Sequence, residues 1–123
     1  MHESLFEYLK RFDFPPLSEE EKMLFKQAFI PSKLRKRQYL LQAGDQCKYF
    51  AFIVKGAMRQ YSVDDKGTEH MVRLGVEEWW MGDRESWVIG TPSVYHNDAW
   101  EDTEMLLVTR PVIMELLKKT TII

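Results

Sequence analysis

Apolar side chains near the start of the chain recur at intervals of about one helical turn. Leu5, Phe6, Leu9 and Phe12 follow this spacing, and Pro15 comes shortly after them. Proline lacks a backbone hydrogen-bond donor and disfavours helical backbone in the residue before it. The pattern therefore predicts a short amphipathic helix that ends ahead of Pro15.

A second helical pattern follows a capping motif. Ser18 and Glu21 have the spacing of a capping box, in which the serine hydroxyl accepts from the Glu21 amide and the glutamate reaches back to the Ser18 amide. Apolar residues then recur at helical spacing from Met23 to Phe29. We predict a second helix that ends before Pro31.

After Pro31 the pattern changes to short runs of β-branched, aromatic and aliphatic residues separated by glycine or aspartate turns. Such a pattern is typical of an all-β roll or sandwich. The segment from Asp64 to Gly67 has the composition of a hairpin turn between two of these runs. We expect strands at 33–40, 49–55, 57–63, 68–75, 79–81, 94–100 and 104–110.

The last apolar stripe begins at Pro111, which fits the first position of a helix because that position needs no backbone donor. Val112, Ile113, Leu116 and Leu117 supply the apolar face of this helix. We expect one domain over 1–123, with a helical cap at 1–30, a β-roll at 33–110 and the start of a C-terminal helix at 111–120.

Composition and charge narrow the class of protein. The chain has 123 residues, 45% of them hydrophobic, which is ordinary for one globular domain. Its net charge of -2 provides no overall basic surface for a phosphate backbone, so we do not expect this chain alone to bind nucleic acid. The basic run from Lys33 to Arg37 is interpreted as a solvated edge.

The single cysteine, Cys47, excludes an internal disulfide and fits a reducing compartment. No stretch approaches the roughly 18 apolar residues that span a bilayer, and the N-terminus lacks the features of a signal peptide. We therefore expect a cytoplasmic protein with no membrane partner.

Several short motifs are specific when they are taken together in this order and spacing. They resemble the sensor domain of the cyclic-AMP receptor protein and fumarate-nitrate regulator (Crp/Fnr) superfamily of bacterial transcription regulators. The resemblance implies a mainly β fold, a double-stranded β-helix or jelly roll of the cyclic-nucleotide-binding type, with N-terminal helices and a C-terminal helix. The motifs are Leu41-Gln42-Ala43-Gly44-Asp45, Phe52-Ile53-Val54-Lys55-Gly56, Asp65-Lys66-Gly67-Thr68-Glu69, Met81-Gly82-Asp83 and Ala99-Trp100-Glu101-Asp102-Thr103.

In that superfamily a short cassette holds the cyclic phosphate. The resemblance places its glycine at Gly82 and the acidic residue for the ribose hydroxyl at Asp83. Helix-terminal amides and an arginine complete it, because both favour a phosphate anion. The arginine position falls on Ser93 and the neighbouring hydroxyl position on Val94. Since loss of such a charged bond costs about 2 to 5 kcal/mol, we do not expect ordinary cyclic-AMP sensing.

Arg73 is the candidate replacement for the missing cation. The register of the motifs puts it where the superfamily carries a pocket-lining residue on a strand of the roll, so it can meet a small anion or a cyclic nucleotide from another wall. The alternative is an arginine that reaches solvent or pairs with a carboxylate, because a β-bulge changes the face to which a side chain points.

Arg84, Glu85 and Ser86 follow Asp83 in the cassette helix and are further ligand candidates. Arg84 and Glu85 either form an internal ion pair over a closed pocket or select a ligand other than a cyclic nucleotide. We favour the ion pair, because large aromatic side chains can fill a small roll. Those side chains are Trp79, Trp80, Trp87 and Trp100.

Arg59 lies early on a predicted strand between apolar neighbours. It either faces the pocket, as a further ligand candidate, or pairs with Glu69 across the hairpin. We expect the pairing with Glu69.

A β-roll also serves cupin enzymes, which bind a metal through clustered histidines and a carboxylate. His2, His70 and His96 do not cluster in the sequence, and the serines lack an evident paired base. We therefore predict no metal ligand, no catalytic residue and no firm cofactor.

The C-terminal helix is the predicted contact of a homodimer. In the superfamily it leads into a dimerisation helix and a helix-turn-helix domain that binds DNA. The apolar residues of this helix, together with Ile122 and Ile123, form a surface suited to association. A ligand-free scaffold or dimerisation module is the alternative to a sensor.

Overall fold

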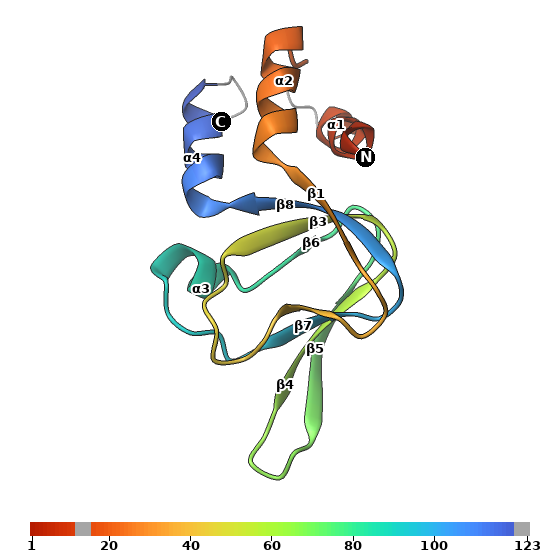
Figure 1. Ribbon diagram of the computed structural model, residues 1–123, viewed down its shortest axis with the longest axis vertical. Helices are drawn as coiled ribbons and strands as arrows, with labels where there is room; N and C mark the ends of the chain where they lie inside the picture. The colour runs from red at the N-terminus through yellow and green to blue at the C-terminus, as the bar shows by residue number, and fades with distance from the viewer. Residues whose placement is uncertain (12–15, 120–123) are drawn as a thin grey trace.

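The computed structural model describes residues 1–11 and 16–119, which form two antiparallel sheets with helices from both ends of the chain (Figure 1). Phe12, Pro15, Ile122 and Ile123 lie outside the described residues, as does residue 120 of the predicted last helix. No helix within the described ranges is long and apolar enough to cross a membrane.

The helices that flank the sheets follow the predicted patterns. α1 spans His2–Arg11, α2 spans Glu19–Ala28 and α4 spans Arg110–Lys119. The capping box of α2 is confirmed, since the Ser18 hydroxyl accepts from the Glu21 amide at 3.1 Å and the Ser18 amide donates to Oε1 of Glu21 at 3.0 Å.

The first sheet has the strand order β1-β8-β3-β6, and the second has the order β2-β7-β4-β5. The predicted strand at 33–40 is wrong, because the chain turns between two short strands in this region, with Arg37 at a positive φ of 77°. The predicted strand at 49–55 coincides with β3, and the remaining predicted strands are present with ends shifted by one or two residues. The strands are β1 (Ile30–Leu34), β2 (Tyr39–Leu41), β3 (Tyr49–Lys55), β4 (Met58–Val63), β5 (Glu69–Gly75), β6 (Trp80–Met81), β7 (His96–Ala99) and β8 (Thr103–Thr109).

Two hydrophobic clusters cover the two faces of the first sheet. Side chains alternate along a strand, so Phe52 on β3 and Leu106 on β8 point toward the helices, where they pack with Phe25 and Leu116. The opposite face packs inside the roll. The cluster there contains Ala51, Ile53, Met81 and Met105 of the first sheet and Met58 of β4 in the second sheet.

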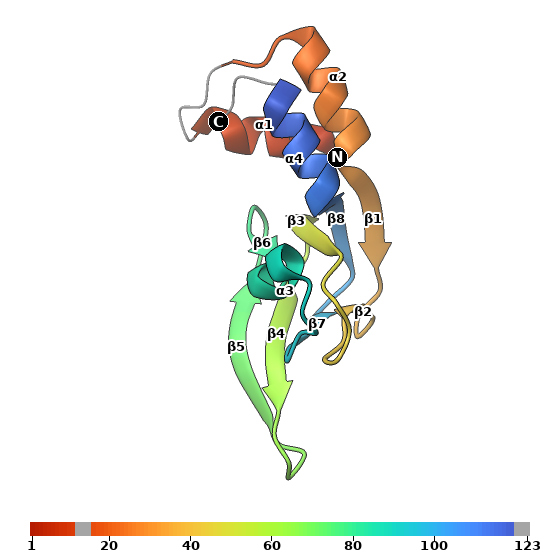
Figure 2. The same ribbon diagram turned by 90° about the vertical axis from the view of Figure 1, so that its left-hand side faces the viewer.

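The three long helices gather at one end of the molecule, and the β4–β5 hairpin extends toward the other end (Figure 2). The turn of this hairpin is the predicted one: the Gly67 amide donates to the Asp64 carbonyl at 3.0 Å. The short helix α3 (Arg84–Ile89) lies beside the sheets, between β6 and β7 in the chain. The helix α3 therefore lies beside the roll, and the helices α1, α2 and α4 pack on the first sheet.

Candidate functional site

The segment between β6 and α3 contains the predicted cassette. Asp83 is the N-cap residue of α3, and its Oδ1 accepts a hydrogen bond from the Ser86 amide at 3.3 Å. Its Oδ2 accepts from the Ser93 hydroxyl at 2.7 Å. Gly82 leaves no room for a side chain, because a Cβ there would lie 2.9 Å from the Phe50 ring. Both carboxylate oxygens of Asp83 are thus engaged by neighbouring residues.

Ser93 stands where the resemblance places the phosphate-binding arginine. Its side chain is buried and hydrogen-bonded to Asp83. Val94, at the neighbouring hydroxyl position, is 66% exposed and has no polar atom in its side chain. In place of a guanidinium fork, this part of the cassette has a serine that holds the acidic residue.

Ser86 connects the cassette to the loop that precedes β3. Its hydroxyl accepts from the Cys47 amide at 2.8 Å and donates to the Thr91 carbonyl at 2.5 Å. The Asp83 amide in turn donates to Sγ of Cys47 at 3.4 Å, and burial raises the pKa of that thiol. Ser86 was predicted as a ligand residue, but it is buried, and its hydroxyl connects the cassette helix to the loops at Cys47 and Thr91.

An open cleft of about 530 Å³ lies beside the cassette. Of the predicted ligand residues, it brings together Arg73, Gly82, Asp83, Arg84 and Glu85. The predicted residues Arg59, Ser86, Ser93 and Val94 do not line it. Its remaining wall includes the aromatic side chains of Tyr8, Phe50, Trp79, Trp80 and Tyr95 and the amide of Gln60.

Arg73 reaches the cleft from β5, where it pairs in register with Gln60 of β4. Its Nη2 donates to the Trp80 carbonyl at 3.0 Å, and its guanidinium lies 5.6 Å from the centre of the Trp79 ring. Within the described ranges it makes no ion pair. A guanidinium has five N–H donors, and one of them has a hydrogen-bond partner among the described residues.

Arg84 and Glu85 do not form the predicted ion pair in the described part of the chain. The reason is geometric, because adjacent residues of a helix point in directions about 100° apart and do not face each other. Both are exposed and line the cleft separately. The pocket that this ion pair was expected to close is open.

The family of the chain follows from its sequence. The profile of the cyclic nucleotide-binding domain family matches residues 31–120, which include the cassette and nearly all of both sheets. The chain belongs to this family. The predicted resemblance and the predicted jelly-roll fold are therefore confirmed.

Solved structures with the same fold come from regulators of several kinds. The sensor domain of the transcriptional regulator DNR from Pseudomonas aeruginosa is 17% identical, with 98% of this chain and 78% of that chain covered and a TM-score of 0.77. The Thermus thermophilus catabolite activator protein is 21% identical, with coverage of 84% and 48% and a TM-score of 0.73. The guanosine-bound regulatory subunit of a cAMP-independent protein kinase A from Trypanosoma cruzi is 17% identical, with coverage of 95% and 41% and a TM-score of 0.73.

These identities establish the fold alone. The chain spans about half the length of the Thermus thermophilus protein, with 48% of it covered. A search of curated proteins found no match.

The prediction that tryptophans fill the roll holds only in part, because Trp80 and Trp87 pack against the core and Trp79 and Trp100 do not. Trp79 and Trp100 are 45% and 44% exposed. Trp80 packs against Phe52 with a ring separation of 5.0 Å, and Trp87 packs against Phe50 at 5.1 Å. Methionines and smaller residues occupy the interior instead, which leaves the cleft beside the cassette open.

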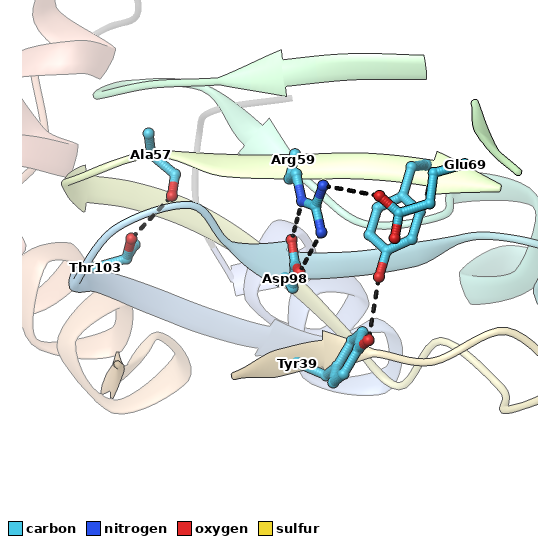
Figure 3. A network of polar contacts seen from close by, with 7 residues as sticks. Tyr39, Ala57, Arg59, Glu69, Asp98 and Thr103 are labelled. Atoms are coloured by element: carbon cyan, nitrogen blue, oxygen red, sulfur yellow. Dashed lines mark hydrogen bonds and ion pairs between the residues drawn. The ribbon is translucent and has the colours of Figure 1, made fainter. Parts of the chain in front are cut away.

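Arg59 belongs to a polar network on the second sheet (Figure 3). It is buried and is not among the residues that line the cleft. The predicted pair with Glu69 is present at 3.2 Å. Its closer partner is Asp98 of β7, which accepts from Nε at 2.8 Å and from Nη2 at 2.9 Å. These bonds raise the pKa of Arg59 above its ordinary value. Arg59 therefore connects three strands of the second sheet and does not line the cleft.

The sequence did not predict that three polar side chains, those of Arg73, Gln60 and Asn97, lie next to each other on adjacent strands of the second sheet. Gln60 of β4 lies between Arg73 of β5 and Asn97 of β7 in the strand register. The Gln60 amide nitrogen donates to the Gly82 carbonyl at 3.0 Å, which ties the strand to the cassette. Asn97 is fully buried, and neither polar atom of its amide has a partner in the described part of the chain.

The three histidines lie in separate environments. His2 contacts the Phe29 carbonyl at 2.7 Å, His70 contacts Asp64 at 2.8 Å, and His96 stacks on Tyr61 with ring centres 5.1 Å apart. Among the described residues, no group of three or more histidine, cysteine or acidic side chains is arranged to hold a metal ion.

Proposed function

We propose that this chain is a ligand-sensing domain of a Crp/Fnr-type regulator whose anion contact has moved from the cassette to Arg73. The observation that carries the proposal is the guanidinium fork of Arg73 in the same cleft as Gly82 and Asp83. A guanidinium is the side chain best suited to bind an oxyanion with paired hydrogen bonds. The role is regulatory and not catalytic.

Binding of cyclic AMP in the usual manner is not part of this proposal. Ser93 is not a cation, and it engages the Asp83 oxygen that is otherwise free to accept from a ribose hydroxyl. A ligand without a cyclic phosphate is supported by the Trypanosoma cruzi relative, which is bound to guanosine. Guanosine is uncharged, so the anionic character of the ligand proposed for this chain rests on Arg73 alone.

The response to the ligand runs through α4. This helix follows β8 directly and packs against α2 through the helical core. A ligand changes an equilibrium only when it binds one arrangement better than another, so gating requires the cleft and α4 to change together. A homodimer through α4 is the assembly that this change controls, and the chain itself does not bind DNA.

The second candidate is a ligand-free scaffold or dimerisation module. The observation that favours it is the exposure of apolar side chains on α4, where Val112 is 40% exposed and Met114 is 46% exposed. Exposed apolar surface of this kind marks association sites. The two functions differ in whether the cleft binds anything.

Calorimetric titration with cyclic AMP and cyclic GMP tests the part of the proposal that concerns the cassette, with Arg73→Met as the variant. We expect no saturable binding of either nucleotide at micromolar concentration by the unmodified chain, because the phosphate fork worth about 2 to 5 kcal/mol is missing from the cassette. Micromolar binding that survives in Arg73→Met contradicts the proposal, since the cassette itself then holds the phosphate.

A further inference from the structure

We propose that the cleft beside the cassette binds an aromatic monocarboxylate, with the carboxylate on Arg73 and the ring between the aromatic side chains of the wall. This inference rests on the proposed function and names the chemical class of the ligand. Three features of the cleft support it: its charge, its hydrogen-bond donors and its aromatic walls.

The charge of the cleft favours a ligand with one negative charge. Arg73 and Arg84 are balanced by Asp83 and Glu85, which line the same cleft. Glu78, at its edge, pairs with Arg11. A monoanion therefore adds one charge to a balanced site, whereas the dianion of a phosphate monoester places a second charge near two carboxylates. Like charges that are brought together in this way oppose binding.

The donors of the cleft favour a planar oxyanion. Arg73 presents a flat guanidinium whose bond to the Trp80 carbonyl uses Nη2 and holds its orientation. A carboxylate has two oxygens in one plane and matches two parallel N–H donors of this fork. The same fork also pairs with two oxygens of a phosphate, but the other phosphate oxygens then need further donors. The cassette does not offer them, because the Asp83 amide is bonded to Sγ of Cys47 and the Ser93 hydroxyl donates to Asp83.

The walls favour an aromatic ring next to that carboxylate. Trp79 is 45% exposed and lies against the Arg73 guanidinium at 5.6 Å. Trp80 and Tyr95, which precede and follow Gly82 in the sequence, also line the cleft. A volume of about 530 Å³ is suited to a small organic molecule and exceeds that of a simple inorganic ion. The ligand therefore carries apolar, planar surface as well as charge.

The test compares phenylacetate and 3-phenylpropionate with phenylacetamide, acetate, inorganic phosphate and cyclic AMP by calorimetry and tryptophan fluorescence. We expect the two aromatic carboxylates to bind at least about tenfold more tightly than phenylacetamide, which has the same ring and no charge, and than acetate, which has no ring. Arg73→Lys keeps the charge and loses the planar fork, so it is expected to weaken binding about tenfold. Unchanged circular dichroism and unfolding midpoint exclude misfolding of this variant.

Two results overturn the inference and leave the proposed function standing. One is Arg73-dependent binding in which phosphate or cyclic AMP exceeds both aromatic carboxylates. The other is a combination of two observations: phenylacetate and phenylacetamide bind equally tightly, and a different anion binds in a manner that depends on Arg73. If none of the anions binds at millimolar concentration, the inference and the proposed function both fail, and the scaffold function replaces them.

Discussion

Asp98→Ala is expected to lower the free energy of unfolding by about 3 to 5 kcal/mol, the largest loss among the changes considered for this chain. Asp98 is 2% exposed and accepts two hydrogen bonds from Arg59, which is itself 7% exposed. Removal of the carboxylate leaves a buried guanidinium whose remaining charged partner is the exposed Glu69. Urea unfolding followed by tryptophan fluorescence measures the loss.

The matched control replaces both members of the pair. Arg59→Leu combined with Asp98→Leu removes both buried charges, so it is expected to recover most of the stability lost in either single variant. A loss below about 1 kcal/mol in Asp98→Ala would show that the pair behaves like a solvated surface ion pair, which contradicts the buried network.

Arg73→Met is expected to weaken anion binding in the cleft by about 10- to 100-fold, with little effect on folding. The loss corresponds to a hydrogen bond to a charged group, which is worth about 1.5 to 3 kcal/mol. Folding is spared because the half-buried Arg73 side chain makes only one hydrogen bond, to the Trp80 carbonyl, in the part of the chain that the structure describes, and the backbone pairing of β5 does not depend on this side chain. Calorimetric titration with phenylacetate measures the affinity, and urea unfolding measures the stability.

Arg35→Met is the control for this change. Arg35 is exposed, does not line the cleft and carries the same charge, so its replacement alters the net charge of the protein equally. If the two variants lose affinity to the same extent, the effect comes from net charge and the site assigned to Arg73 is wrong.

Most of the helices, strands and turns could be predicted from residues that lie close together in the sequence. The capping box of α2 needs only Ser18 and Glu21, which are three residues apart, so spacing alone predicted it. The hairpin turn at Asp64 to Gly67 depends in the same way on adjacent residues. The strand prediction at 33–40 failed because Arg37 turns the backbone, and a positive φ is an unusual choice for arginine that composition does not reveal.

Contacts between distant strands could not be predicted in the same way. Glu69 was expected as the partner of Arg59 because both lie on one hairpin, whereas Asp98 arrives from β7, on the other side of β4. The unpartnered amide of Asn97 is another example, since its position beside Gln60 depends on the register of β4 and β7. Register between strands follows from tertiary packing, which a single sequence does not display.

The prediction that Arg73 lines the site depended on the face of β5 from which its side chain extends. The register between β4 and β5 shifts between Gln60 and Tyr61, an irregularity of the kind that turns a side chain to the opposite face. Arg73 nevertheless lines the cleft with Gly82 and Asp83. The sequence did not predict that the cleft is open. The prediction of a closed pocket was based on the size of the tryptophan side chains, and the sequence does not indicate where each indole ring packs.

The most direct test of a ligand site at the Arg73 cleft is the indole N–H spectrum of ¹⁵N-labelled protein during titration with phenylacetate and, separately, with cyclic AMP. Trp79 and Trp80 line the cleft, and Trp87 and Trp100 do not, so the four signals contain their own control. We predict that phenylacetate shifts the Trp79 and Trp80 signals in a saturable manner and leaves the Trp100 signal unchanged. Saturable shifts confined to Trp87 or Trp100, or no shift with either compound, would contradict a ligand site at Arg73.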